Sequence, residues 1–279
     1  MATIQRAEET LDLTFSSVEL DEQRDHITSF IEAQYDAAGA DTAVIALSGG
    51  IDSTLTSHLA VEALGAENVY GLVLPSEVNR DRNMSDAERV ADELLDIEYD
   101  VIEVEPLVDA ILGAYPGFHA AERESYQTTT GNLRARLRAV LNYVAANHRN
   151  GLVLGTGNRS EAAVGYFTKY GDGAVDCLPI ANLYKQQVRQ LATHLGVPED
   201  LAEKTASAGL WAGQTDEDEL GLTYDTLDSI LALHIDGPLS TSATASELDV
   251  EESVIEKVRA MHETTAHKRQ APPGPEPLY

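Results

Sequence analysis

The stretch Ser48-Gly49-Gly50-Ile51-Asp52-Ser53 places two glycines and a carboxylate directly behind the apolar run 43–47. Glycines let the backbone turn tightly and approach a ligand closely, and the first turn of a following helix offers unpaired N–H groups to an anion. The composition therefore predicts a phosphate cradle, while a plain strand-to-helix turn remains the alternative. The chain contains no GxxxxGK[ST] pattern, which disfavours ordinary P-loop NTPase chemistry.

Asp52 within this loop predicts a divalent cation. A carboxylate beside a bound phosphate is repelled unless a cation lies between them, so we expect Mg²⁺. A second apolar run, 151–154, also ends in glycines, and it is followed by Thr156 and Glu161. Glu161 is placed like Asp52 and is a candidate second metal ligand, and Thr156 is a candidate nucleotide contact. Ser-Glu at a helix start is also good capping chemistry, so this second pattern is weak on its own.

Lysine is scarce in this chain, which contains five. Lys169 and Lys185 lie in the glycine- and aromatic-rich stretch 165–187, and Lys268 follows His267. A protein with so few lysines has little surface use for them, so these three are candidate phosphate ligands. Chance placement is the alternative.

Three arginines follow one another at alternate positions, Arg134, Arg136 and Arg138. Residues two apart on a helix do not share a face. We therefore expect Arg136 to point away from the other two.

Strands and helices that alternate along the chain must position these residues. Apolar, β-rich runs occur at 42–48, 68–75, 98–105 and 151–157. Helical patterns occur between them and on both sides, at 21–39, 52–65, 85–96, 131–151, 184–198, 225–234 and 250–263. Near-continuous apolar strands joined by helices predict an α/β fold with a doubly wound, Rossmann-like parallel sheet. Ligands of such sheets lie beyond the carboxyl ends of the strands.

We see no linker or internal repeat, so we expect a single domain over residues 1–279. The proline-rich stretch 271–279 cannot continue a helix and is expected to form an extended or mobile tail. The first 30 residues show neither an export signal nor a membrane span. A cytoplasmic location is the expectation.

The charge balance is strongly acidic, with 47 acidic against 19 basic residues and a formal net charge of −28. Such a field repels nucleic acid and anionic membranes, so neither is an expected partner. The acidic residues recur along the whole chain, which predicts an acidic surface similar to that of proteins from organisms that hold molar salt. The single cysteine, Cys177, excludes an internal disulfide and is best interpreted as a small buried hydrophobe.

Several motifs together resemble a known family. The loop at 48–53 resembles the pyrophosphate loop of the N-type ATP pyrophosphatases. Its combination with "GNLRARLR", "GTGNRSEAAVGYFTKYGDGAVD", "PIANLYKQQVRQLA", "SAGLWAGQTDEDELG" and "HKR" is similar to the ammonia-dependent NAD synthetases. The resemblance covers residues 43–232 and 267–269 and implies the nucleotide-binding sheet of the adenine nucleotide α-hydrolase kind.

The resemblance also implies roles for individual residues. It places ATP on Ala46, Leu47, Ser48, Gly49, Gly50, Ile51, Asp52, Ser53, Thr156, Lys185 and Ser207. It places deamido-NAD on Arg136, Lys169, Asp176, His267 and Lys268, across a homodimer interface. Mg²⁺ would lie on Asp52 and Glu161, and the catalytic residues would be Asp52, Lys185 and Asp176, the last as an ammonium site or base. Arg82 is left unassigned.

The implied reaction is an ATP-dependent ligation. The nicotinate carboxylate of deamido-NAD attacks the α-phosphorus of ATP, pyrophosphate leaves, and ammonia then displaces AMP from the acyl adenylate to form NAD. Free ammonia is the expected nitrogen source, with a separately encoded glutaminase as the alternative. Two rival functions remain at this point, namely a GMP-synthetase-like ligase that amidates another acid and a non-enzymatic ATP-binding sensor of similar fold.

Overall fold

Four parallel strands form one sheet in the computed structural model, which describes residues 13–76, 80–116, 123–207 and 214–276, without the side chains of 80–83 and 123–125. Within those residues the strand order is β3-β2-β1-β4. The strands are β1 (Thr42–Leu47), β2 (Val69–Val73), β3 (Glu98–Val101) and β4 (Gly151–Leu154). Ala43 of β1 lies beside Val69 of β2 and Leu152 of β4. All four predicted strands are confirmed, as is their parallel arrangement.

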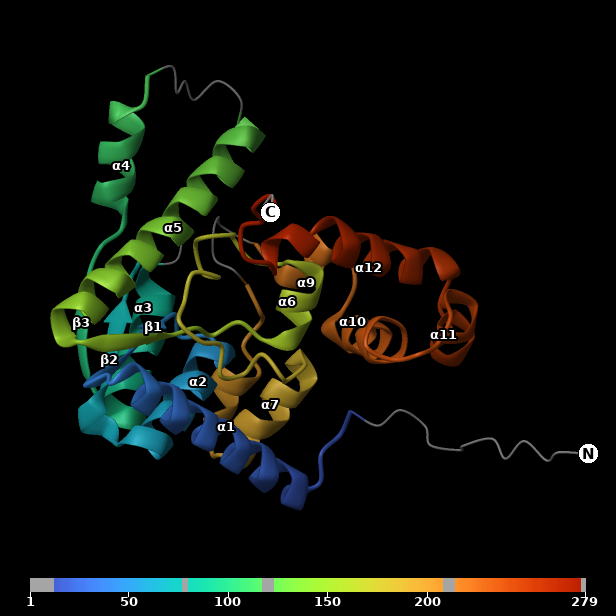
Figure 1. Cartoon of the computed structure of the whole chain (residues 1–279), viewed down its shortest axis with the longest axis horizontal. Helices are drawn as coiled ribbons and strands as arrows, with labels where there is room; N and C mark the ends of the chain where they lie inside the picture. Colours follow the sequence, from blue (N-terminus) through green and yellow to red (C-terminus); the bar gives the residue numbers. More distant parts are fainter. Residues whose placement is uncertain (1–12, 77–79, 117–122, 208–213, 277–279) are drawn as a thin grey trace, which may run out of the picture.

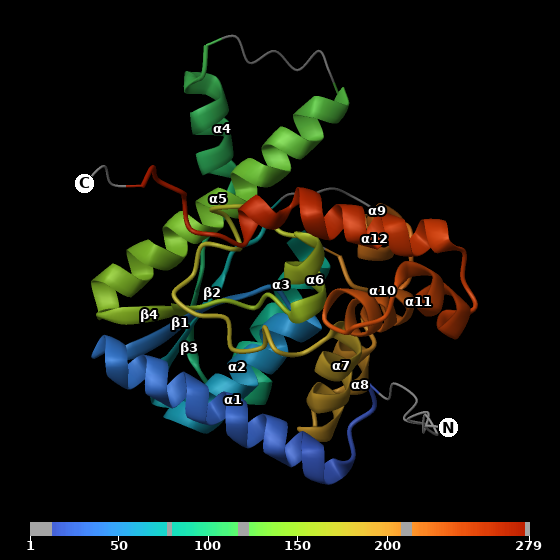
Figure 2. The same cartoon turned by 45° about the vertical axis from the view of Figure 1, so that its right-hand side comes forward.

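Helices cover both faces of this sheet (Figures 1 and 2). Ile45 of β1 belongs to a core shared with one set of helices, whereas the next residue back, Val44, belongs to a core on the opposite face. The first set is α1 (Ser17–Ala38), α2 (Ile51–Leu64) and α7 (Lys185–His194), and the second is α4 (Glu105–Ala114) and α5 (Arg123–Arg149). Because alternate side chains of a strand point to opposite faces, this burial confirms the doubly wound class.

The boundaries of α1 show how local sequence sets an element. The Ser16 hydroxyl accepts a hydrogen bond from the Glu19 N–H (3.3 Å), and the Ser16 N–H donates to the Glu19 carboxylate (2.7 Å). Gly39 ends the helix with φ +60°, a conformation that glycine adopts without strain. The predicted helix at 21–39 therefore exists and begins one turn earlier than its apolar pattern suggested.

The remaining helices are short and mostly C-terminal. They are α3 (Arg80–Arg89), α6 (Arg159–Val164), α8 (Glu199–Ala202), α9 (Asp216–Leu220), α10 (Tyr224–Ile230), α11 (Thr241–Leu248) and α12 (Glu252–Thr264), with π-helical turns at Val90–Leu95 and Leu231–Ile235 and 3₁₀ turns at Ala66–Asn68 and Ala266–Lys268. Helices α10, α11 and α12 lie to one side of the sheet, beyond α6 (Figure 1). They bury an apolar cluster of their own around Tyr224, Leu227 and Ile255.

The end of the described chain has no regular structure. Residues 271–276 are exposed and form neither helix nor strand, and 277–279 lie outside the described residues. No helix in the described ranges is long and apolar enough to cross a membrane.

Candidate active site

A cavity of about 580 Å³ lies at the carboxyl ends of three neighbouring strands. Its wall includes the residues that directly follow β1, β2 and β4, namely Ser48 and Gly50, Pro75 and Ser76, and Gly155 and Thr156. This is the edge where the fold class binds its ligands. The sequence therefore predicted both the sheet and the edge that carries the site.

The glycine loop is the shortest connection in the site, since β1 ends at Leu47 and α2 begins at Ile51. Gly49 has φ +67°, in the left-handed region. The Ser48 hydroxyl accepts a hydrogen bond from the Gly50 N–H (3.2 Å), and the Ser53 hydroxyl accepts one from the Ser48 N–H (3.3 Å). The loop is thus held by its own hydroxyls while the first turn of α2 faces the cavity through Ile51 and Asp52.

Lys185 joins the loop to a second carboxylate. It is the first residue of α7, its side chain is 2% exposed, and its ammonium contacts Asp52 and lies 3.3 Å from Glu161 Oε1. Asn158 ties the two carboxylates together from the start of α6. Its Nδ2 donates to Asp52 Oδ1 (2.8 Å), and its Oδ1 accepts from the Glu161 N–H (3.0 Å). Four residues from α2, α6 and α7 thus meet at one point.

The ionisation states of Asp52, Glu161 and Lys185 depend on one another. Burial raises the pKa of Glu161 to about 8, against the Lys185 ammonium, which lowers it, and the Asp52 carboxylate adds to the rise. Burial by itself would lower the pKa of Lys185, but Asp52 and Glu161 outweigh it and the pKa lies above its ordinary value. A cation bound between Asp52 and Glu161 would favour the ionised form of Glu161, so the arrangement suits a further cation.

Asp52 and Glu161 fit a magnesium ion in their chemistry. Mg²⁺ prefers hard oxygen ligands and is usually held by one or two carboxylates together with substrate phosphates and water. Both carboxylates line the cavity beside the phosphate-type loop. Among the described residues, no group of three or more His, Cys, Asp or Glu side chains is arranged to hold a metal ion. Asp52 and Glu161 would thus leave the other coordination positions of Mg²⁺ to water and substrate phosphate.

Comparison with known proteins identifies one family. The model of the NAD synthase family matches residues 24–272. The chain is 57% identical over 265 residues to an NH(3)-dependent NAD(+) synthetase of Halobacterium salinarum, covering 95% of this chain and 97% of that protein. It is 45% identical over 270 residues to the corresponding enzyme of Hyperthermus butylicus (96% and 94%). The chain belongs to the NAD synthase family.

Solved structures agree with this assignment. An NMN synthetase from Francisella tularensis superposes with a TM-score of 0.79 at 36% identity, covering 94% of this chain and 99% of that one. An NH3-dependent NAD synthetase from Campylobacter jejuni superposes with a TM-score of 0.75 at 28% identity, covering 92% and 99%. The solved structures thus agree with both the family and the Rossmann-like fold. The curated relatives are ligases of NAD biosynthesis.

Most of the residues predicted to bind ATP come together at the cavity. Those that line the cavity are Ala46, Leu47, Ser48, Gly50, Ile51, Asp52, Thr156, Lys185 and Ser207. Gly49 and Ser53 belong to the same stretch, 48–53, but are not part of the cavity wall. Arg82 lies on α3, and its side chain is outside the described residues.

The residues predicted to bind the second substrate are divided. Lys268 lines the cavity, and its ammonium donates to the carbonyls of Gly165 (2.7 Å) and Phe167 (2.8 Å). Arg136, Lys169 and His267 lie together, and none of them belongs to the cavity wall. Arg136 Nη2 donates to the Lys169 carbonyl (3.3 Å), and Lys169 Nζ donates to the His267 carbonyl (2.6 Å). Sequence segments 98 residues apart thereby form one cationic surface patch of Arg136, Lys169 and His267.

Arg136 does point away from its neighbours on α5, as expected. Arg134 pairs with Glu105 of α4 (2.5 Å), and Arg138 Nε donates to the Leu74 carbonyl (3.1 Å) at the cavity wall. Arg136 is exposed.

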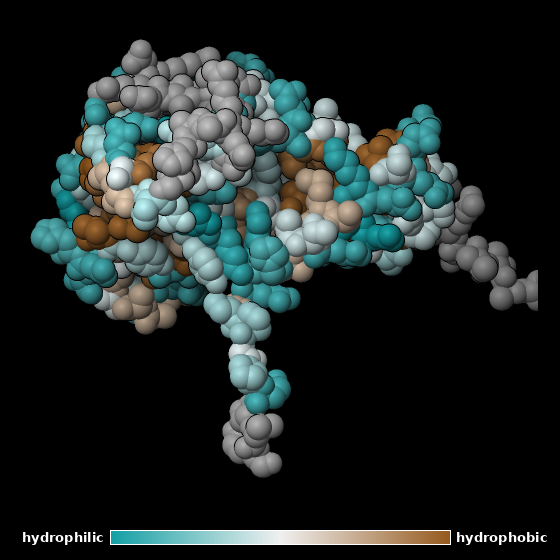
Figure 3. Space-filling view, turned by 90° about the horizontal axis from the view of Figure 1, so that it is seen from above, coloured by the Kyte–Doolittle hydropathy of each residue, from teal (hydrophilic) through white to brown (hydrophobic). Residues whose placement is uncertain are grey.

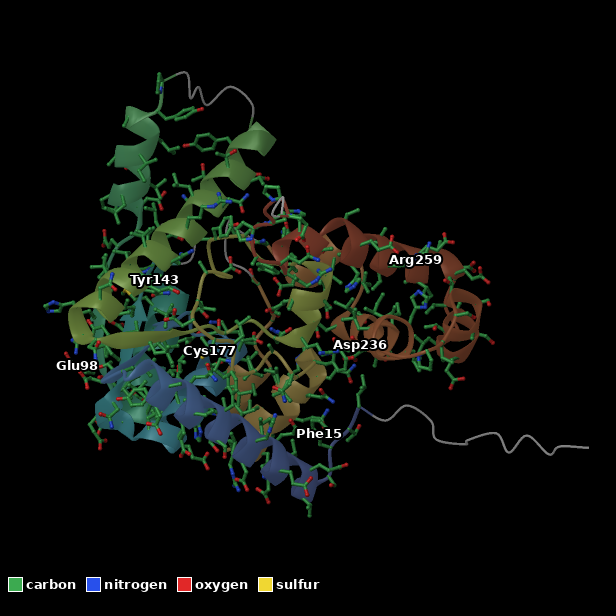
Figure 4. The ribbon with its side chains drawn as sticks, viewed as in Figure 1. Phe15, Glu98, Tyr143, Cys177, Asp236 and Arg259 are labelled. Carbon is green, nitrogen blue, oxygen red and sulfur yellow. The ribbon has the colours of Figure 1, made fainter. Side chains whose placement is uncertain are left out.

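Asp176 lies apart from the cavity lining. Its carboxylate accepts hydrogen bonds from the Tyr143 hydroxyl (3.0 Å) and the Val153 N–H (2.8 Å), which fixes it between α5 and β4. The neighbouring Cys177 accepts the Gly155 N–H at its carbonyl (2.9 Å) and extends the sheet edge beside Leu154 (Figure 4). Burial raises the pKa of the Cys177 thiol to about 11, which suits packing and not nucleophilic chemistry.

Asp228 of α10 is a buried residue that the sequence analysis missed. Its carboxylate accepts the Ser160 hydroxyl (2.5 Å) and the Gln186 N–H (2.9 Å), and the Lys185 N–H donates to the Ser160 hydroxyl (2.9 Å). Burial raises the pKa of Asp228 to about 6. Asp228 therefore fixes the first turn of α7, from which Lys185 extends. The available signal was a carboxylate between Leu227 and Ile230, on the apolar face of a helix.

A pair of tyrosines was also missed. The Tyr224 hydroxyl donates to Asp216 Oδ2 (3.0 Å) and the Tyr166 hydroxyl donates to Asp216 Oδ1 (3.0 Å) and to Glu219 (2.5 Å). Burial raises the pKa of both tyrosines, so they remain neutral donors. They explain why the stretch "QTDEDELG" carries acidic residues that face the cavity.

Proposed function

We propose that this NAD synthase family member is an ammonia-dependent NAD⁺ synthetase, which amidates deamido-NAD with ammonia at the expense of ATP. The observation that carries the proposal is the glycine loop, Lys185 and two carboxylates in one cavity. The chain's 57% identity to an NH(3)-dependent NAD(+) synthetase supports the choice of substrates.

In the first step the nicotinate carboxylate oxygen forms a bond to the α-phosphorus of ATP, and the bond from that phosphorus to the pyrophosphate oxygen breaks. The N–H groups of the loop and of the first turn of α2 would hold the β- and γ-phosphates. The Lys185 ammonium, buried and charged, stabilises the negative charge that develops on the leaving group. No side-chain nucleophile is needed, because the chain's task is to place two bound reactants in line.

Asp52 and Glu161 are the proposed Mg²⁺ ligands. When bound, the ion would supply additional positive charge toward the phosphate oxygens. The chain's own contribution is to hold the two carboxylates in place, with Asn158 donating to Asp52 from its Nδ2 and to Glu161 from its backbone N–H, and to keep Lys185 between them.

In the second step the nitrogen of ammonia forms a bond to the acyl carbon of the adenylate, and the bond to the AMP oxygen breaks. Ammonium must lose a proton before it attacks. Asp176 remains the proposed ammonium site or base and a proposed contact of deamido-NAD. Its exposed position between α5 and β4 supports a role at a surface that a second molecule completes.

The proposed assembly is a homodimer that shares the second-substrate site. Arg136, Val140 and Val144 recur at four-residue spacing along α5, and the two valines are 57% and 60% exposed. Tyr170, beside Lys169, is 57% exposed. Figure 3 shows apolar residues exposed on the side of the molecule where α4 and α5 lie. An apolar strip beside the cationic surface patch is the composition expected where a partner covers both.

The acidic surface supports a proposal about conditions. We infer that the protein acts in a cytoplasm of high ionic strength, because a screening length of about 3 Å at 1 M salt suppresses repulsion among surface carboxylates. Equal folding and activity in dilute buffer and in molar KCl would contradict this inference.

A second candidate function follows from one comparison. The superposed Francisella protein is described as an NMN synthetase, so a mononucleotide acid is the competing substrate. The test is mass spectrometry of products after incubation with ATP, ammonium and Mg²⁺, with either deamido-NAD or nicotinate mononucleotide as the acid. NAD, AMP and pyrophosphate from the first mixture only are the expected result. Product from the second mixture only would favour the mononucleotide enzyme. If neither acid leads to release of pyrophosphate, both functions are refuted.

A further inference from the structure

Lys204 lines the cavity but has no role in the reaction described above. It follows α8, and its ammonium donates to the Gly49 carbonyl (3.0 Å) and to Asp86 Oδ2 (2.6 Å). Its side chain is 15% exposed and that of Asp86 is 20% exposed. Lysines 185 and 204 therefore contact the loop at different points, Lys185 at Asp52 and Lys204 at the Gly49 carbonyl.

The contact with Gly49 fixes the least ordinary part of the loop. Gly49 has φ +67°, so its peptide groups are oriented differently from those of an extended strand. A hydrogen bond from an ammonium is charge-assisted and stronger than one between neutral groups. Lys204 therefore restrains the peptide that leads into the anion-binding turn, from a position 155 residues further along the chain.

The charge balance of the site calls for a second cation at this point. Lys185 is already engaged by Asp52 and Glu161. A departing pyrophosphate adds several negative charges, and the loop contains no lysine of its own. The residues after Lys204, which include Ser207, continue along the cavity wall.

We propose that Lys204 is a pyrophosphate-binding residue, which holds the Gly49 peptide and places a positive charge beside the diphosphate that leaves ATP. The proposal rests on the proposed function only for the source of that diphosphate. In this proposal Lys204 has the role that the Walker lysine has in P-loop proteins, which is to place a positive charge beside the phosphates. Unlike the Walker lysine, it comes from a segment far from the loop in the sequence.

The test is calorimetric binding of pyrophosphate with Mg²⁺ to the full chain, without the acid substrate, together with steady-state KM values for ATP and deamido-NAD. We expect Lys204→Ala to weaken pyrophosphate binding about tenfold or more and to raise the KM for ATP, with the KM for deamido-NAD unchanged. Lys204→Arg should recover part of the affinity. Lys257→Ala removes the same charge from an exposed position on α12 and should change nothing.

The variant Asp86→Ala distinguishes an effect of the Lys204 charge from a purely structural effect of the Lys204–Asp86 ion pair. It breaks the same ion pair but leaves the positive charge, so pyrophosphate binding should not weaken. If Asp86→Ala weakens binding as much as Lys204→Ala, or if Lys204→Ala binds within twofold of wild type with an unchanged urea midpoint, the proposal is wrong. A wild-type chain that binds pyrophosphate but makes no NAD would refute the proposed function alone, whereas one that binds neither ATP nor pyrophosphate would refute both.

Discussion

The lysines in the two halves of the candidate site have different kinds of partners. On the loop side, the Lys185 ammonium is buried between the Asp52 and Glu161 carboxylates. On the second-substrate side, Lys169 and Lys268 are held by backbone carbonyls. Within the described residues, neither of these two lysines has a carboxylate within 4.0 Å in an ion pair.

The difference indicates which kind of ligand each half of the site suits. On the loop side Lys185 is already engaged by two carboxyl groups, and a cation bound together with phosphate would favour the ionised form of Glu161 beside it. Ammonium groups solvated by carbonyls keep their full positive charge, which suits an anionic dinucleotide. The residues of the loop side meet within one chain, whereas Arg136 and His267 are exposed on the other side. That exposure supports the proposal that a second copy completes the second-substrate site.

The largest expected effect is on the loop side. Asp52→Asn removes one proposed metal ligand and the partner of Lys185, and we expect kcat to fall about a thousandfold or more. The measurement is pyrophosphate release at saturating substrates. Asp109→Asn, at an exposed position on α4, is the matched control and should retain activity. Turnover of the Asp52 variant within tenfold of wild type would contradict the metal assignment.

The next effect distinguishes the two kinds of lysine by stability. Lys185→Met leaves two carboxylates without their cation in a buried position, and it should cost about 3–5 kcal/mol in the free energy of unfolding. Lys268→Met removes hydrogen bonds to two carbonyls and a cation–π contact with Phe167, and it should cost about 1–2 kcal/mol. Urea unfolding of both variants at one salt concentration checks the order. A larger loss for Lys268 would reverse the comparison.

A smaller effect is expected on the surface patch. Arg136→Ala should raise the KM for deamido-NAD about tenfold to a hundredfold, while the KM for ATP changes less than twofold. Arg259→Ala, on the exposed side of α12 (Figure 4), is the control for loss of a surface arginine and should match wild type. A change in the KM for ATP instead would place Arg136 with the first substrate.

The smallest effect concerns Asp228, which acts on the loop side through α7. Asp228→Asn should lower kcat less than tenfold with unchanged KM values, because the amide still accepts one of the two hydrogen bonds. The pKa of Asp228 is raised by burial from 3.8 to about 6, so its protonated form is favoured in the folded state. Its contribution to stability is full below pH 4 and is lost as the pH rises through 6.

Urea midpoints from pH 4 to 7 check this sign. The stability of wild type relative to Asp228→Asn should decrease as the pH rises across that range. A difference that stays constant, or that grows with pH, would mean that the carboxylate is ionised in the folded protein throughout.

Much of this protein was predictable from sequence because its signals are local. Runs rich in apolar β-branched residues predicted the four strands, and the turn Ser48-Gly49-Gly50 follows one of them directly. In a parallel sheet all carboxyl ends meet at one edge, so Asp52 and Glu161 were expected there together. Their shared contact with Lys185 confirms that they meet.

The tertiary structure decided what depends on segments far apart in the chain. Asp228, Asp216 and Lys204 acquire their partners from α6, α7, the tyrosines and the loop, and no local pattern ties them to those partners. Lys268 lines the cavity, whereas Arg136, Lys169 and His267 lie outside its wall. This division likewise depends on how distant segments pack against one another. The sequence by itself determined which residues could do chemistry, because backbone propensity and hydrophobic periodicity are local. Which charges are buried together was decided only by folding, because burial depends on neighbours that the sequence does not place side by side.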